Sequence, residues 1–172
     1  MAVVNTKSTE VSNLDSAVQT LNPAGTSHAR SYSKVATVET AAADDDGSVY
    51  RFFRVHSSWV ILSLVIYCDA ITSGTDFDVG LYQTAANGGA VVDADAYINT
   101  IDLSSALRSG TEVRYGGANG GANGVETVGQ KVWQNAALSA DSNRYYDICA
   151  TGNTVGSAAG TISMRGLFAG NV

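Results

Sequence analysis

Closely spaced aspartates are the first candidates for chemistry in this chain, because paired carboxylates can bind a cation or act as an acid and base. They are Asp44-Asp45-Asp46, Asp76 with Asp78, and Asp93 with Asp95. Carboxylate oxygens are the ligands that Ca²⁺ prefers, but none of these groups has the spaced Asp, Gly and distal Glu of a calcium loop. Aspartate is also common in turns, where its side chain accepts nearby backbone N–H groups. We favour turn residues over an incidental structural cation, and we expect no cofactor.

The two histidines, His28 and His56, are the candidates for acid–base catalysis. A Ser-His-Asp hydrolase needs a histidine oriented by a carboxylate beside a nucleophile, and no pattern joins either histidine to such partners. The sequence has no phosphate-binding, dinucleotide-binding, zinc-protease or nucleophile-elbow motif. Nothing in it indicates the two facing carboxylates of a glycosidase. We therefore expect no catalytic residues and no enzyme activity.

Two tryptophans and two cysteines complete the candidate residues. Trp59, Trp133 and the eight tyrosines can bind a sugar by stacking, but such side chains are more often core or interface anchors. Because Trp59 begins the most apolar segment, we expect it in the core or at its rim. Cys68 and Cys149 form no CxxC motif and no His/Cys cluster. We expect free thiols that pack as small hydrophobic side chains, and no bound metal.

The charge composition limits the class of partner. Charged residues make up 15% of the chain, and the formal net charge is −6, whereas an average protein has about 25% charged residues. The Lys and Arg residues are scattered, which argues against nucleic-acid binding and against docking to anionic lipid. Such a weakly charged surface is either covered by a partner or solubilised by Ser, Thr and Asn.

The N-terminal residues predict no targeting segment. The chain becomes polar within its first five residues, so we expect no signal peptide there. The longest apolar run, 59–68, is interrupted by Ser63 and is far shorter than the ~20 residues of a membrane span. We expect synthesis in a reducing cytoplasm and no membrane contact.

Residues 1–32 form one compositional unit, rich in Ser, Thr and Asn and containing the single proline. Its hydrophobic residues have helix-like spacing, but poor helix formers separate them, so we expect an extended arm with at most one helical turn. Such a polar arm is stable when it lies on another surface; the alternative is a frayed terminus. The residues expected to bind a partner are Asn5, Lys7, Val11, Leu14, Val18, Leu21 and Arg30.

From residue 33 the hydrophobic pattern has a period of two, which predicts β-strands. The strongest is 60–68, where alternation places Leu62 on the same buried face as Leu64, and apolar residues on both faces indicate a central strand. Segment 77–82 is predicted to be half-buried. Further strands are expected at 33–40, 47–55, 112–115, 125–128, 145–151 and 161–168, a helical or bent segment at 131–137, a helical turn at 103–108 and a mobile glycine-rich hairpin tip at 116–124.

About eight short strands with closely spaced turns and no long helical pattern exclude a parallel βαβ sheet. Two antiparallel sheets packed face to face are the natural arrangement. We therefore predict an all-β fold, an antiparallel, jelly-roll-like β-sandwich over residues 33–172 that follows an extended N-terminal arm over residues 1–32.

Several stretches of the chain resemble the capsid decoration, or cement, proteins of tailed bacteriophages. They are NTKS (5–8) with NLD (13–15), GSVYRFFRV (47–55), DA (69–70) through FDVGLY (77–82), GGAVVD (88–93), and Trp133 with YDI (146–148). The resemblance implies a jelly-roll-like sandwich on the outer face of a capsid, which forms dimers or trimers at symmetry axes and clamps neighbouring major capsid subunits. The repeat at 116–124 departs from the family pattern.

Three functions remain to be compared with the structure. The first is a structural virion protein on the capsid surface, with the major capsid protein as its partner. The alternative is a carbohydrate-binding β-sandwich, receptor-binding or lectin-like, which would present exposed coplanar rings around Trp59 or Trp133. A hydrolase on a β scaffold is the third, and it would need a cleft with paired carboxylates.

Overall fold

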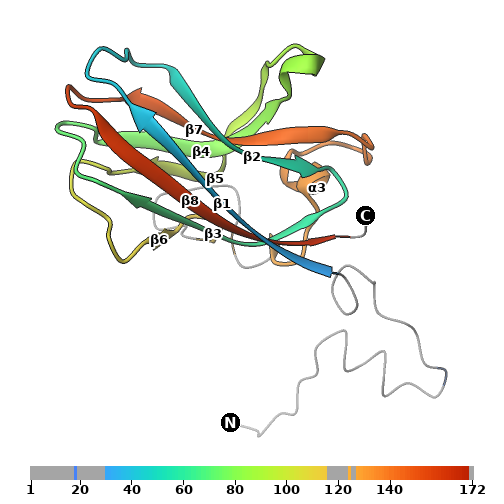
Figure 1. The fold of residues 1–172 in the computed structure, drawn as a ribbon. Coiled ribbons are helices and arrows are strands. Elements are labelled where there is room, and N and C mark those ends of the chain that lie inside the picture. Colours follow the sequence, from blue (N-terminus) through green and yellow to red (C-terminus); the bar gives the residue numbers. More distant parts are fainter. Residues whose placement is uncertain (1–17, 19–29, 116–123, 125–126, 171–172) are drawn as a thin grey trace, which may run out of the picture.

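The computed structural model describes residues 18, 30–115, 124 and 127–170 of the chain. They form two four-stranded antiparallel sheets packed face to face, so the predicted all-β sandwich is confirmed (Figure 1). The strands are β1 (Arg30–Thr40), β2 (Ser48–His56), β3 (Val60–Cys68), β4 (Asp76–Gln83), β5 (Val91–Ile101), β6 (Thr111–Glu112), β7 (Tyr145–Thr154) and β8 (Gly160–Gly170). Two short helical segments, η1 (Ala85–Asn87) and α3 (Val132–Asn135), lie in the connections.

The strand order identifies the sandwich as a jelly roll. The first sheet, called here the β1 sheet, has the order β1-β8-β3-β6, and the second, the β2 sheet, has the order β2-β7-β4-β5. The first strand, β1, pairs with the last, β8. Moving inward from the two ends of the chain, β2 pairs with β7, β3 with β6, and β4 with β5. This is a long antiparallel ribbon folded over into two layers, which is the jelly-roll topology.

The core lies between the two sheets and joins residues that are far apart in sequence. Phe77 and Ile148 of the β2 sheet and Ile66 and Phe168 of the β1 sheet are fully buried in it. Each such side chain stabilises the fold by about 2 kcal/mol relative to exposure. The apolar side chains of Ile98, Ile101, Leu103, Ile148, Ile162, Met164 and Phe168, which their sequence pattern places in the core, are all buried. Cys68 and Cys149 are free and buried, as expected.

A β-bulge changes the predicted faces of β3. The pairing of β3 with β8 shifts register between Ile61 and Ser63. The extra residue reverses the alternation at this point, so Ile61 is fully buried and Leu62, predicted to be buried, is 38% exposed. The prediction that β3 is an interior strand is confirmed, because it lies between β8 and β6.

Three other local predictions were wrong. β4 was expected to be half-buried, but both of its faces are buried, because β5 passes over Gly80 with the Asp93 and Ala94 carbonyl groups. Residues 103–108 form bends and a turn rather than a helical turn, and 127–129 form a turn rather than a strand. The predicted hairpin tip at 116–124 lies outside the described residues, apart from residue 124.

Candidate docking surfaces

The arm residues predicted to bind a partner are not brought together among the described residues. Arg30 is the first residue of β1, where it is exposed and lies opposite Gly170 of β8. Val18 is 83% exposed. The other five, Asn5, Lys7, Val11, Leu14 and Leu21, lie outside the described residues. The strand therefore includes the last three residues of the predicted arm, 30–32, and the role of the arm stays a prediction.

The aspartates of the 44–46 turn hold the turn together. The Asp44 carboxylate accepts hydrogen bonds from the Ala41 N–H (2.9 Å) and the Tyr50 hydroxyl (2.8 Å), and these bonds lower its pKa. The Asp46 carboxylate accepts the Val155 N–H at 3.0 Å, which joins this turn to the connection between β7 and β8. Both side chains therefore act as the turn residues that the sequence suggested.

The other two aspartate pairs lie on β4 and β5. Asp78 accepts the Thr100 N–H at 2.8 Å and the Asn153 side-chain amide at 2.7 Å. Burial, with a smaller contribution from neighbouring Asp95, raises the pKa of Asp93 to about 6. The pKa of Asp95 itself is lowered by the hydrogen bond from Asn99. Within the described ranges, no three His, Cys, Asp or Glu side chains are grouped to hold a metal ion.

The groups of a serine hydrolase lie near His56 without being connected in the order that catalysis needs. The His56 Nδ1 atom lies 2.8 Å from the Ser58 hydroxyl, and the ring packs edge-on against Tyr145. The Asp141 carboxylate accepts the Ser57 hydroxyl, which lowers the pKa of Asp141. Among the described residues no hydrogen bond joins Asp141 to His56, so the histidine is not oriented as a general base.

The tryptophans do not form a sugar-stacking platform. Trp59 is half-buried at the rim of the core, as predicted. Its ring stacks on Tyr32 at 5.4 Å between centroids, and Lys34 lies over it at 4.9 Å. The backbone of Gly170 also lies against this ring. Trp133 is half-buried as well, and its indole nitrogen is enclosed.

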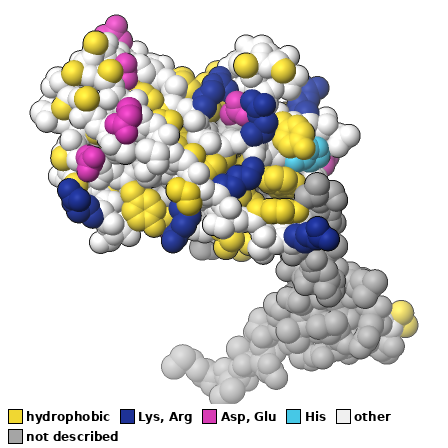
Figure 2. Space-filling view, viewed as in Figure 1, with side chains coloured by type: hydrophobic (Ala, Val, Ile, Leu, Met, Phe, Trp, Pro, Cys, Tyr) yellow, Lys and Arg dark blue, Asp and Glu magenta, His cyan; other side chains and the backbone are white. Residues whose placement is uncertain are grey.

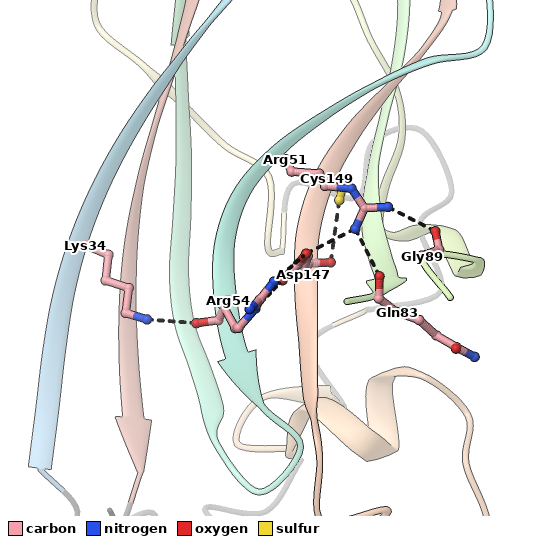
Figure 3. A network of polar contacts seen from close by, with 7 residues as sticks. All are labelled: Lys34, Arg51, Arg54, Gln83, Gly89, Asp147 and Cys149. Atoms are coloured by element: carbon pink, nitrogen blue, oxygen red, sulfur yellow. Dashed lines mark hydrogen bonds and ion pairs between the residues drawn. The ribbon is translucent and has the colours of Figure 1, made fainter. Parts of the chain in front are cut away.

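An Arg-Asp-Arg network lies on the outer face of the β2 sheet (Figure 3). Alternation predicts that Arg51 and Arg54 face opposite ways, but a bulge at Phe52 turns both toward Asp147 of β7. Asp147, only 6% exposed, lies 3.1 Å from Arg51 and 2.9 Å from Arg54. The Arg51 guanidinium also donates to the carbonyl oxygens of Gln83 (3.0 Å) and Gly89 (2.9 Å). It thereby fixes the connection between β4 and β5 against this sheet.

The rest of that outer face is closed over by the chain itself. Cys149 points outward from β7 but is fully buried, and its burial raises the pKa of the thiol to about 12. The buried Tyr82 and Thr151 hydroxyls are hydrogen-bonded to each other at 2.7 Å. Together with the passage of β5 over Gly80, these contacts cover the outer face of β4 and part of that of β7. An open hollow of about 370 Å³ remains over β2, beside Arg51, Arg54 and Asp147.

The outer face of the β1 sheet is open. Its side chains form rows across the strands: Ser33, Leu167 and Ser63 in one row, and Val35, Arg165 and Val65 in the next. Val35 is 72% exposed, Leu167 39% and Leu62 38%. A shallow hollow of about 250 Å³ lies between Ser33, Ser63, Arg165 and Leu167. We call these seven residues the β1-sheet face.

The distribution of charge supports the β1-sheet face as a docking surface. Figure 2 shows hydrophobic and basic side chains side by side where Figure 1 places β1, while acidic side chains gather at the end that carries the β1–β2 turn. In the described part of the chain, the Arg165 side chain makes no ion pair and no hydrogen bond. Arginine among exposed apolar side chains is typical of the centre of a protein interface.

Sequence patterns indicated this face only in part. Alternation along 33–40 predicts that Val35, Thr37 and Glu39 share one face, and in the structure this is the exposed face of β1. It gave no sign that Arg165 would lie beside Val35, because that contact depends on pairing between the first and last strands. No helix among the described residues is long and apolar enough to cross a membrane.

Comparison with known proteins shows similarity of fold. No protein-family model and no curated protein matches the chain. A chain of the capsid of Ralstonia phage GP4 is similar with a TM-score of 0.55 at 11% identity, over 90% of this chain and 92% of that one. A chain of the cyanophage Pam1 capsid asymmetric unit is similar with a TM-score of 0.52 at 12% identity, over 90% and 96% respectively.

Proposed function

We propose that this chain is a structural component of a tailed-phage virion, made in the host cytoplasm, that decorates the outer surface of the capsid. In this role it clamps neighbouring major capsid subunits, as a dimer or trimer at the symmetry axes of the shell, and catalyses no reaction. The proposal rests mainly on one observation: the similarity of fold to chains from two phage capsids extends across 90% of this chain.

The described geometry is compatible with such a clamp. A clamp works by contacting several subunits at once, so that its total affinity exceeds that of any single contact. The β1-sheet face provides one open surface, and residues 1–29 precede the first strand. We propose that Val11, Leu14, Val18 and Leu21 of this segment pack on a capsid subunit and that Asn5, Lys7 and Arg30 add polar contacts.

The test is binding to capsid shells assembled without this chain from the major capsid protein of the same phage. Sedimentation of shells with increasing amounts of the chain should give saturable binding at a fixed ratio to the capsid subunit. Occupied shells should also disassemble at a higher temperature, because binding to the assembled state stabilises it by mass action. A chain that stays in the supernatant at every concentration would contradict the proposal.

The role of the arm is tested by removing residues 1–29 while leaving β1 complete. A cut after residue 32 would also remove Tyr32, which stacks on Trp59 and pairs with Phe168. The shorter cut should leave the free energy of unfolding within about 0.5 kcal/mol of the full chain and weaken shell binding by at least about tenfold. A Gly/Ser segment of equal length is the control for the loss of specific side chains, and unchanged binding would remove the arm from the clamp.

A further inference from the structure

The β1-sheet face carries Arg165, a cation that has no ion-pair partner among the described residues and lies between apolar side chains. In its row, Arg165 lies between Val35 and Val65, and Leu167 follows it two residues along β8. Side chains alternate in direction along a strand, so Arg165 and Leu167 point to the same side. The face therefore offers an apolar surface with a single positive charge near its centre.

Two acidic residues on the same side of the β1 sheet, outside the β1-sheet face, are already engaged elsewhere. Glu112, at the end of the Arg165 row, accepts hydrogen bonds from the Ser63 hydroxyl and from the backbone N–H groups of Leu64 and Arg114. Glu39 accepts the Thr161 hydroxyl at 3.0 Å and lies four residues along β1 from Val35, about 13 Å away. Neither carboxylate neutralises Arg165, so its positive charge is available to pair with a carboxylate of a partner.

The charge pattern argues against a second copy of the chain as that partner. A two-fold contact brings the same surface patch of each copy together. Centred on the exposed apolar residues, such a contact would place Arg165 near Arg165 of the other copy, and like charges brought together in an interface are destabilising. A different protein with a carboxylate at this point meets no such penalty.

We infer that the β1-sheet face docks on the major capsid subunit, at a flat apolar patch that carries one exposed carboxylate, and that this carboxylate pairs with Arg165. The inference rests on the proposed function and gives it a surface and a chemistry. Apolar contacts around Val35 and Leu167 exclude water from the ion pair, which makes the pair stronger than an exposed one. The shallow hollow beside Arg165 takes a side chain that projects from the partner.

The test compares Arg165→Glu with Arg144→Glu in binding to the same capsid shells. Arg144 is exposed just before β7, on the side of the β2 sheet, and no ion pair of its side chain is found among the described residues. The two variants have the same net charge. We expect Arg165→Glu to weaken binding by at least about tenfold and Arg144→Glu to change it less than about twofold. Val35→Ser should weaken binding by a smaller factor without affecting the fold.

The outcomes separate this inference from the proposed function. If the unmodified chain binds shells and Arg165→Glu binds equally well, the docking face is wrong while the capsid role stands. If the unmodified chain does not bind, the proposed function fails. If the chain alone forms oligomers in sedimentation equilibrium that Arg165→Glu dissociates, the occupant of this face is a second copy, and the inference is overturned. Unfolding curves of each variant verify that the sandwich is intact.

Discussion

The two outer faces of the sandwich differ in what covers them. On the β2 sheet, the chain closes over its own strands: β5 passes over Gly80, Arg51 holds the β4–β5 connection, and Cys149 is fully buried. On the β1 sheet, Val35 and Arg165 remain exposed. Outward-facing side chains of the β2 sheet are therefore largely covered by the chain itself, whereas those of the β1 sheet remain accessible to a partner. Substitutions on the covered face should lower stability, and substitutions on the open face should leave stability unchanged and alter binding.

The largest expected effect is that of Gly80→Ala on the covered face. A methyl group there would lie 2.1 Å from the Asp93 carbonyl oxygen and 2.3 Å from that of Ala94, so β5 must move. We expect a loss of about 3 kcal/mol of unfolding free energy, measured by urea denaturation. On the open face, the control Ser33→Ala should stay within about 0.5 kcal/mol. Equal effects at the two positions would contradict the distinction between the faces.

The second largest loss of unfolding free energy is expected when the carboxylate that pairs with two arginines is removed. Asp147→Ala leaves Arg51 and Arg54 without their ion pairs, and both guanidinium groups keep partial access to water. The expected destabilisation is therefore about 2 kcal/mol, below that of a fully buried pair. Arg165→Ala, which breaks no ion pair among the described residues, should change stability by less than about 0.5 kcal/mol. A larger effect for Arg165 would show that the open face also supports the fold.

The smallest effect concerns the pH dependence of Asp93. Because its folded-state pKa is raised from 3.8 to about 6, its protonated form favours folding, and this contribution is lost as the pH rises from about 4 to about 6. Asp95, whose pKa is lowered, contributes stability that is lost on acidification. Asp93→Asn should therefore raise the unfolding free energy at pH 7.5 by about 1 kcal/mol, allowing for solvent screening, with no gain at pH 4. An equal gain at both pH values would exclude titration of Asp93 as the cause.

Hydrophobic alternation predicted most of the strands, but it predicted neither β5, whose segment has no regular alternation, nor how the strands bend. The bounds of β3 agree with the segment expected at 60–68, because every residue of this segment except Ser63 is apolar or aromatic. Bulges reversed the faces of Leu62 and placed Arg51 and Arg54 together. Nothing in a local pattern marks a bulge, since it arises from the pairing of that strand with one distant in sequence.

The site was less predictable than the fold because it depends on contacts between distant segments. Arg165 and Val35 are adjacent only through the pairing of β1 with β8. Arg114, which is fully buried, is a second example: its guanidinium lies over the rings of Tyr97 and Tyr115 and donates to Asn135. From its polar, glycine-rich sequence surroundings, Arg114 would be expected to be exposed. Its aromatic neighbours become apparent only in the folded structure.

The folded-ribbon topology also sets when the protein can form. Thr40 and Gly160 are hydrogen-bonded to each other at one end of the β1–β8 pair and are 120 residues apart in sequence. A ribosome that translates about 5–20 residues per second needs roughly ten seconds to synthesise the segment between them. During that interval β1 has emerged without the strand that it pairs with. Apart from Val35, its exposed-face residues Ser33, Thr37 and Glu39 are polar, which limits aggregation of an unpaired strand. Non-local pairing of this kind places the jelly roll among slowly folding topologies, and β8 is the strand whose synthesis allows the β1 sheet to close.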